Sequence, residues 1–457
     1  MSTDPSNTKE DLLTSFDGGY KCKVKTRNII SAADLIAFDD LKSKHFISRG
    51  AGMSFAPASF AKDTISLLNQ GKSAIEFDKE NKLVQVEAGI SMGELGHFLM
   101  QKGFYLKTVP GYPSITVGGC IASDAHGKNQ LQDGTFQNLV DSFELYHPAH
   151  GLQKVSRASN LKLFDLTCGG FGLTGHLLSC KLRISKLKSQ YMNLHTEELT
   201  NIYDLPLALE RIFKRDCDML LSWHNFLLNG NKFGHGFIQY GFFAKNLPFK
   251  PDTDTSLIAK PDPGLFADSR GEGWPPLFGF PATSLMNSLY TYLQKMSCVS
   301  PKAIPLSSCS FPSLKLRDLY FSAFGSTGFL EHQAVVPVFD FADYIDRIKW
   351  WLQANDLPIT IASSKYFGGS GKYLQFKQAG ICFAMDFPRC QKAYEFLEYL
   401  DQVCIELGCL PNIIKDSRIG AFCVSKTYRE YEKFRKDLRD YDPARLCRSE
   451  LSCRLKL

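Results

Sequence analysis

Short runs of alternating apolar and polar residues recur through the first 190 residues of the chain. Such alternation is typical of half-buried β-strands. The runs lie at 45–48, 74–77, 83–88, 139–147 and 180–184. Two further runs have apolar residues at helical spacing, and each follows a capping sequence, Ser31 with Asp34 and Ser91 with Glu94. The first part of the chain is therefore predicted to mix strands and helices.

The pattern changes near residue 190. Residues 200–245 combine an amphipathic helix with strands rich in aromatic residues. Further strands are predicted at 329–339 and 380–387, and further helices at 341–354, 390–407 and 428–441. Residues 246–286 hold many prolines and little periodicity, which predicts a lid or a disordered cover. Residues 1–18 are polar and are expected to be disordered.

Glycine-rich segments adjoin strand patterns at 50–52, 118–119 and 169–175. Glycine lets a backbone approach another group closely, and successive backbone N–H groups can then face an anion. One such segment is commonly an ordinary turn. Three of them in one α+β domain favour a dinucleotide-type cofactor whose pyrophosphate is held by backbone amides, because the chain has no Gly-x-x-x-x-Gly-Lys-Ser/Thr loop.

A literal Gly-x-Gly-x-x-Gly occurs at residues 170–175. A Rossmann site requires a helix directly after the last glycine. Residues 180–184 instead alternate as a strand does. A nicotinamide site of that type is therefore excluded.

Composition narrows the class of protein. The chain has 457 residues, 44% of them hydrophobic and 22% charged, which is typical of a globular protein of two or three domains. Its net charge of +6 is lower than the strongly basic charge expected of a protein that binds nucleic acid. The 14 cysteines include no Cys-x-x-Cys pair, so no zinc site, other metal site or disulfide framework is expected. Neither a signal-peptide pattern nor an apolar run of about 18 residues occurs, which favours a cytoplasmic protein.

Four motifs follow one another in the first part of the chain. They are Arg-Gly-Ala-Gly-Met-Ser at 49–54, Pro-Gly-x-x-x-x-Thr-Val-Gly-Gly at 110–119, Asp-x-His-Gly-Lys-Asn at 124–129 and Gly-Gly-x-Gly-Leu-Thr-Gly at 169–175. This order resembles the FAD-binding domain of the vanillyl-alcohol-oxidase superfamily, also called the PCMH-type domain. Within it, the chain is most similar to the decaprenylphosphoryl-β-D-ribose 2′-oxidase branch. Further matches to that branch lie at 328–330, 415–418 and 442–455.

The resemblance implies an α+β, two-domain FAD-binding fold with a sheet-based substrate domain. The FAD-binding domain would comprise residues 20–190, completed by residues 411–457, and the substrate-binding domain residues 191–410. Many relatives attach the flavin covalently through a histidine, and here that position is Met53. A thioether cannot form this link, so FAD is expected to bind non-covalently.

The resemblance also implies roles for individual residues. Lys415 falls at the active-site lysine, where a cation could stabilise a reduced flavin or a developing alkoxide, or act as a base. His126 would donate or accept a hydrogen bond near the flavin or the substrate hydroxyl. Without the resemblance, a solvated lysine and a histidine held within a turn are the simpler interpretations.

The remaining implied contacts are with the cofactor and the substrate. The implied cofactor contacts come from Arg49, Gly50, Ala51, Gly52, Met53, Ser54, Phe55, Pro110, Gly111, Thr116, Gly118, Gly119, Ala122, Ser123, His126, Gly127, Asn129, Gly172, Thr174, Gly175 and Lys415. The implied substrate contacts come from Gln333, Lys365, Cys382 and Ala384. For two of these residues a simpler interpretation is equally open: Gln333 lies on an exposed face of a strand, or Lys365 lies in a loop, without contacting the substrate.

Three departures from the branch concern the substrate. Phe55 lacks the hydroxyl of a tyrosine, Glu331 replaces a glutamine, and Ala384 replaces a cysteine. The implied reaction is hydride transfer to flavin N5 from a secondary alcohol of a sugar, most closely the 2′-hydroxyl of a polyprenyl-phosphate-linked ribose, a cell wall precursor. One alternative is an oxidase of a free polyol or aldonolactone, and another is a flavin-fold scaffold that has lost its chemistry.

The same resemblance implies the partners. A separate NADH-dependent reductase would complete the conversion of the keto product. Basic residues near the C-terminus mildly favour a phosphate-bearing, lipid-linked substrate and peripheral contact with the inner face of a membrane. No nucleic-acid partner is expected.

Overall fold

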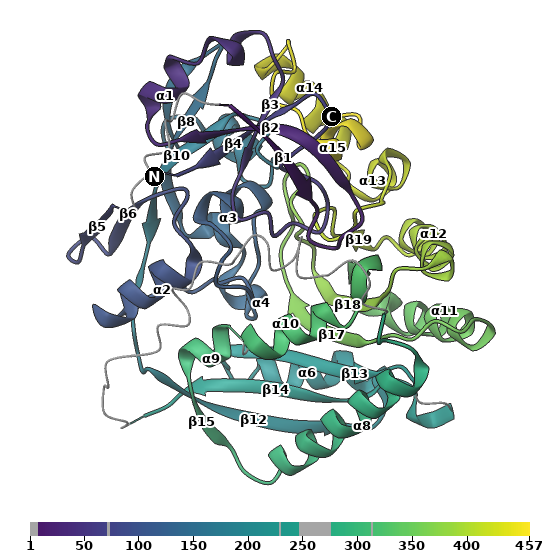
Figure 1. Ribbon diagram of the computed structural model, residues 1–457. Helices are drawn as coiled ribbons and strands as arrows, with labels where there is room; N and C mark the ends of the chain where they lie inside the picture. Colours follow the sequence, from purple (N-terminus) through teal and green to yellow (C-terminus); the bar gives the residue numbers. More distant parts are fainter. Residues whose placement is uncertain (1–7, 71–73, 228–229, 246–275, 312–313) are drawn as a thin grey trace.

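The computed structural model describes residues 8–70, 74–227, 230–245, 276–311 and 314–457. Figure 1 shows two parts: the start and the end of the chain lie together in one, and the middle of the chain forms a broad sheet with helices in the other. Helices and sheets are mixed as in an α+β, two-domain PCMH-type fold, which confirms the predicted fold class.

The first part contains two main sheets. One has the order β1-β2-β4-β3, with β2, β4 and β3 parallel and β1 antiparallel. Its strands are β1 (Lys9–Thr14), β2 (Lys21–Ile29), β3 (Phe46–Arg49) and β4 (Ile65–Asn69). The other is antiparallel, in the order β5-β6-β10-β8-β9. Its strands are β5 (Ile75–Asp78), β6 (Leu83–Glu87), β8 (Val140–His147), β9 (Gly151–Ser156) and β10 (His176–Arg183).

Short helices and a small sheet surround these strands. The helices are α1 (Ala32–Ile36), α2 (Met92–Gln101), α3 (Val117–Ser123), α4 (Gln130–Asp133) and α5 (Leu161–Thr167), and β7 (Phe104–Tyr105) pairs with β11 (Ser185–Lys186). The predicted capping box of α2 is present: Ser91 Oγ accepts a hydrogen bond from the Glu94 N–H, and the Glu94 carboxylate accepts one from the Ser91 N–H. Apolar residues of α2, α3 and α5 form one core with the antiparallel sheet.

The second part is built on an eight-stranded antiparallel sheet in the order β15-β12-β14-β13-β17-β18-β16-β19. Its strands are β12 (Tyr191–Leu199), β13 (Met219–Asn225), β14 (His235–Phe243), β15 (Lys302–Pro305), β16 (Phe329–Val336), β17 (Ile361–Phe367), β18 (Gly380–Pro388) and β19 (Leu410–Pro411). Helices α6 (Leu205–Phe213), α11 (Phe341–Ala354) and α12 (Gln391–Glu406) share one apolar core with this sheet. The other helices of this part are α8 (Phe280–Ser297), α9 (Leu306–Ser310) and α10 (Leu314–Ser322).

The end of the chain returns to the first part (Figure 1). Helices α13 (Ala421–Thr427), α14 (Tyr431–Tyr441) and α15 (Glu450–Arg454) follow one another there. The Phe46 N–H donates to the Leu446 carbonyl at 2.8 Å, and Phe46 and Cys447 form a parallel bridge. The C-terminal segment is therefore tied directly to β3.

Three sequence expectations differ from the structure. Residues expected to be disordered include β1, which pairs with β2 along its whole length. Residues 280–286, assigned to a structureless cover, begin helix α8, whereas residues 246–275 of that cover lie outside the described residues. The stretch around 118–119, expected to be a turn, is helix α3, because Thr116 caps it and small residues tolerate its close packing. The strand predicted after the 170–175 glycines is present as β10.

Among the described residues, no helix combines the length and the apolar character needed to cross a bilayer.

Candidate active site

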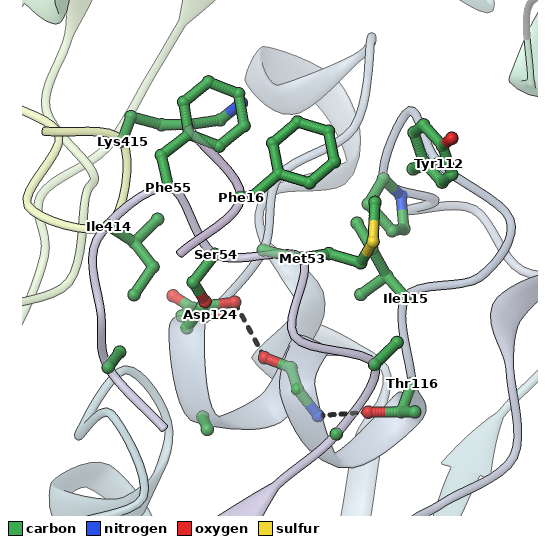
Figure 2. A pocket seen from close by; sticks show the side chains of 18 of the residues that line it. Phe16, Met53, Ser54, Phe55, Tyr112, Ile115, Thr116, Asp124, Ile414 and Lys415 are labelled. Carbon is green, nitrogen blue, oxygen red and sulfur yellow. Dashed lines mark hydrogen bonds between the residues drawn. The ribbon is translucent and has the colours of Figure 1, made fainter. Parts of the chain in front are cut away.

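A cavity of about 430 Å³ lies where the two parts of the chain meet. Its walls come from the loop after β3, the segment around α3, the start of β10, the strands β16, β17 and β18, and the loop at 412–415. Segments far apart in sequence therefore converge on one site. Figure 2 shows part of it, with Phe16, Met53 and Phe55 beside Ile115 and Lys415.

The loop after β3 supplies backbone donors. Among the described residues, the N–H groups of Ala51, Gly52 and Met53 find no acceptor within the protein, and all three residues line the cavity. Gly52 has φ +68°, a conformation that side chains disfavour. At Gly50, a Cβ atom would come within 2.3 Å of Thr116 Oγ1, so only glycine allows this loop to lie against α3. The arrangement fits an anion such as a pyrophosphate.

The glycine-rich segment at 118–119 does not offer backbone N–H groups to an anion, although the sequence pattern predicted it. The Gly118 N–H donates to the Ala88 carbonyl at 2.8 Å, and the Gly119 N–H donates to Thr116 Oγ1 at 3.2 Å. These two N–H groups are therefore occupied within the protein. The role of Gly118 and Gly119 is steric: they line the cavity without a side chain.

At one end of the cavity, a lysine and a carboxylate form a pair. Lys415 Nζ lies 3.4 Å from Glu331 Oε2 and 3.6 Å from the centre of the Phe55 ring. Figure 2 shows the lysine reaching across this ring. Glu331 is buried, its Oε1 atom accepts no hydrogen bond from an amide, hydroxyl or amine of the described residues, and the carboxyl group of Asp386 lies within hydrogen-bonding reach of the Glu331 carboxylate. A carboxylate beside an ammonium group can accept a proton from a bound hydroxyl.

A second carboxyl group faces the first. Asp386 pairs with Glu331 in the register of β16 and β18, and its Oδ2 accepts a hydrogen bond from Tyr320 at 3.0 Å. Burial raises the pKa of Asp386 well above its usual value, and the charge of Glu331 raises this pKa further. The raised pKa favours the protonated form of Asp386, and it is Glu331 that Lys415 contacts.

His126, Gln333 and Lys365 line the cavity next to this pair. Burial, and after it the charge of Lys365, lower the pKa of His126 to about 3, so the imidazole is neutral at physiological pH. Burial also lowers the pKa of Lys365. Asn412 Nδ2 donates to Gln333 Oε1 at 2.5 Å, so the Gln333 amide group has a fixed orientation and its NH₂ remains as a donor.

Most of the implied site residues lie at this cavity. Of the cofactor set, all but Asn129 and Thr174 line it. The Asn129 side chain contacts Gln132 and Asp133, and Thr174 is buried with its hydroxyl 3.0 Å from that of Thr167. Of the substrate set, Gln333, Lys365 and Ala384 line the cavity, whereas Cys382 is buried in the core opposite Lys365 in the strand register. Asn129, Thr174 and Cys382 therefore contact other protein groups and do not line the cavity.

The sequence interpretation assigned no site role to several residues that line the cavity. These include Phe16, Ser48, His176, Phe321, Asp386 and Asn412. His176 is buried, its Nδ1 lies 3.0 Å from Ser48 Oγ, and within the described structure its Nε2 has no partner. Its position directly after Gly175 was a usable signal, because a polar side chain at the start of a buried strand needs a partner. Phe16 lacked any such signal, since it lies far from every motif.

Comparison with known proteins agrees with this geometry. Residues 22–155 match the family model described as FAD binding domain. Decaprenylphosphoryl-beta-D-ribose oxidase of Mycolicibacterium smegmatis is 27% identical over 385 residues, which are 83% of this chain and 82% of that protein. Mitochondrial L-galactono-1,4-lactone dehydrogenase of Arabidopsis thaliana is 26% identical over 40% of this chain and 32% of its own length. D-lactate dehydrogenase of Archaeoglobus fulgidus is 25% identical over 35% of this chain and 38% of its own length.

The cavity fits FAD on its own chemistry. The unpartnered N–H groups of residues 51–53 suit a pyrophosphate, the apolar wall of Met53, Phe55 and Ile115 suits a flat ring system, and the unpartnered nitrogen of His176 can bond a further polar group. FAD is therefore the cofactor, and the chain is a flavoprotein whose residues 22–155 match the FAD binding domain family.

Proposed function

We propose that this protein oxidises a secondary alcohol of a sugar, with FAD as the hydride acceptor. The observation that carries the proposal is the pair of Lys415 and Glu331 at one end of the FAD cavity, with the buried carboxyl group of Asp386 beside Glu331. The similarity to FAD-dependent oxidases and dehydrogenases supports the same class of reaction.

The reaction removes a hydride from the alcohol carbon and a proton from its oxygen, so that a ketone forms. FAD supplies the hydride acceptor when it is bound. Glu331 takes the hydroxyl proton, because its carboxylate lines the cavity beside Lys415. The Lys415 ammonium group stabilises the negative charge that develops on the substrate oxygen. Asp386 keeps its proton and adds no second charge.

Neighbouring groups would hold the sugar. The NH₂ of Gln333, oriented by Asn412, donates to a sugar oxygen. The neutral His126 ring bonds a hydroxyl without adding charge. Lys365 places a second cation in the cavity, where a phosphate group or a ring oxygen would bind.

The preferred substrate is a polyprenyl-phosphate-linked ribose, oxidised at its 2′-hydroxyl. The similarity to decaprenylphosphoryl-beta-D-ribose oxidase over most of both chains favours it. A separate NADH-dependent reductase would then act on the keto product. A free polyol or aldonolactone is the second candidate, and the similarity to L-galactono-1,4-lactone dehydrogenase favours that one.

Anaerobic bleaching of the bound flavin tests the proposal. The FAD-loaded protein is mixed with a short-chain prenylphosphoryl ribose, with a free pentitol and with an aldonolactone, and the flavin absorbance is followed. We expect the fastest bleaching with the prenylphosphoryl sugar. Bleaching by the free polyol or the lactone alone would assign the second candidate. A protein that binds FAD but is bleached by none of them would be a scaffold, and the proposal would be wrong.

A further inference from the structure

The turn that joins β1 to β2, residues 15–20, lies against the candidate active site. Phe16 of this turn lines the cavity. Its ring stacks on the Phe55 ring with the centroids 5.1 Å apart, and its N–H donates to the Ser54 carbonyl at 3.1 Å. Phe55 is the ring over which Lys415 Nζ lies at 3.6 Å (Figure 2). The turn therefore supports the ring on which the ammonium group rests.

The next residue of the turn, Asp17, is a buried carboxylate with both oxygens occupied. Its Oδ1 accepts hydrogen bonds from Ser15 Oγ at 2.6 Å and from the Gly19 N–H at 2.9 Å, and these bonds fix the turn itself. Its Oδ2 accepts one from Arg389 Nη2 at 2.5 Å and one from Ser417 Oγ. A carboxylate with four donors, one of them a guanidinium group, is held in a single position.

Arg389 connects Asp17 to the strands that carry the carboxyl pair. It directly follows β18, the strand of Asp386. Its Nη2 also donates to the Phe329 carbonyl at 3.0 Å, and the Phe329 N–H donates to the Asp17 carbonyl at 3.2 Å. Phe329 is the first residue of β16, two residues before Glu331. Asp17 is thus bonded to both strands, through its side chain and its backbone.

Ser417 connects Asp17 to the loop that carries the lysine. It lies two residues after Lys415, between β19 and α13. The Lys415 N–H donates to the Asn412 carbonyl at 3.1 Å, so the loop is folded on itself, and a shift of Ser417 is passed on to the lysine. Lys415 Nζ lies 3.4 Å from Glu331 Oε2, which is longer than the roughly 2.7–2.9 Å of a tight ion pair. The placement of the ammonium group therefore depends on where the loop is held.

We propose that Asp17 is a positioning residue that sets the distance between the Lys415 ammonium group and the Glu331 carboxylate. It holds the lysine loop through Ser417 and the two strands through Arg389, so it fixes both sides of the pair at once. The inference rests on the proposed function, in which these two charged groups act on the substrate hydroxyl. Placement of such groups matters because a shift of about 1 Å can slow a reaction about 100-fold.

Ser417→Ala tests the inference in the full, FAD-loaded chain, because it removes one hydroxyl and leaves Asp17 paired with Arg389. Anaerobic flavin reduction by the prenylphosphoryl sugar is followed by stopped-flow absorbance. We expect the limiting rate to fall about tenfold or more, with the substrate concentration at half this rate little changed, because only an interaction with the transition state is lost. Ser417→Thr keeps the hydroxyl and should restore the rate. Ser425→Ala is the matched control, since Ser425 Oγ donates to the Phe422 carbonyl within α13.

Acylation of Lys415 by the N-hydroxysuccinimide ester of acetic acid gives a second readout that needs no substrate. Peptide mass spectrometry follows the reaction in the same FAD-loaded variants. We expect Lys415 to react about tenfold faster in Ser417→Ala than in the wild type, the factor that one hydrogen bond to a charged group contributes. Lys426, an exposed lysine of α13, should react at the same rate in both. Asp17→Asn should change the reduction rate and the acylation rate in the same directions as Ser417→Ala.

Three results would overturn the inference. The first is an unchanged reduction rate together with unchanged acylation of Lys415 in Ser417→Ala. The second is an equal effect in the Ser425→Ala control. The third is faster acylation of Lys426 along with Lys415, because that would indicate a general loosening of the fold. If no sugar reduces the wild-type flavin, the proposed function fails, and the acylation rates still decide whether Ser417 holds Lys415 in place.

Discussion

Replacement of Glu331 by glutamine tests the proton acceptor directly. The side chain keeps its size, and the buried position keeps a polar group, but the carboxylate charge is lost. In the wild-type protein the Glu331 oxygen lies 3.4 Å from Lys415 Nζ. Coulomb's law gives this pair about 5 kcal/mol at an effective dielectric constant of about 20, which is an upper bound because the lysine is partly exposed.

The expected effect is on the rate of flavin reduction. A positioned general base contributes about 100-fold to 10,000-fold, so Glu331→Gln should slow reduction by a factor in that range. Stopped-flow absorbance under anaerobic conditions measures this rate at saturating substrate. The dissociation constant of FAD, measured by fluorescence, should be little changed, because Glu331 lies at the substrate end of the cavity.

Asp386→Asn is the matched control. Since the raised pKa of Asp386 favours its protonated form, asparagine replaces it with a neutral group of similar shape, and reduction should change little. Equal rates in Glu331→Gln and wild type would refute the assignment of the base. A large loss in Asp386→Asn with none in Glu331→Gln would reverse the roles of the two carboxyl groups.

Four further predictions concern the cofactor and the stability of the fold. Replacement of His176 by phenylalanine should raise the dissociation constant of FAD about tenfold, which corresponds to the free energy of one hydrogen bond to a buried group. A fluorescence titration measures this constant, and an unchanged constant would exclude the contact. Acid precipitation should release the flavin into the supernatant, because Met53 offers no covalent link; flavin retained in the pellet would contradict this. Burial lowers the pKa values of His224 and His332 to about 4, so the unfolded chain binds protons that the folded chain cannot. As the pH falls from about 6.5 to about 4, each of these two histidines should therefore lower the free energy of unfolding by up to about 1.4 kcal/mol per pH unit. Denaturant unfolding measures this, and a free energy of unfolding independent of pH in this range would refute it. Arg418→Ala should destabilise the protein by about 3–5 kcal/mol, because it removes the ion-pair partner of the half-buried Asp401 and of the buried Asp416; a loss within about 0.5 kcal/mol, as at an exposed site, would contradict that.

The sequence by itself determined the local structure wherever short-range physics decides it. Alternation predicted β5, β6, β8 and β10, and the capping residues marked the start of α2. These features depend on contacts within a few residues, so the chain carries them locally. The motif order also identified the class of cofactor, and most of the residues it implied line one cavity.

Tertiary structure decided which groups remain available for chemistry. The N–H groups of Gly118 and Gly119 are used within the protein, whereas those of residues 51–53 are not, and no local pattern distinguishes the two glycine segments. Glu331 and Lys415 are 84 residues apart, and only the pairing of β16 with β18 and β19 brings them to one site. The same holds for Asp17, whose partners Arg389 and Ser417 lie 372 and 400 residues further along the chain. A side chain's free donors, acceptors and apolar surface are what remains after packing, and packing joins residues that the sequence keeps far apart.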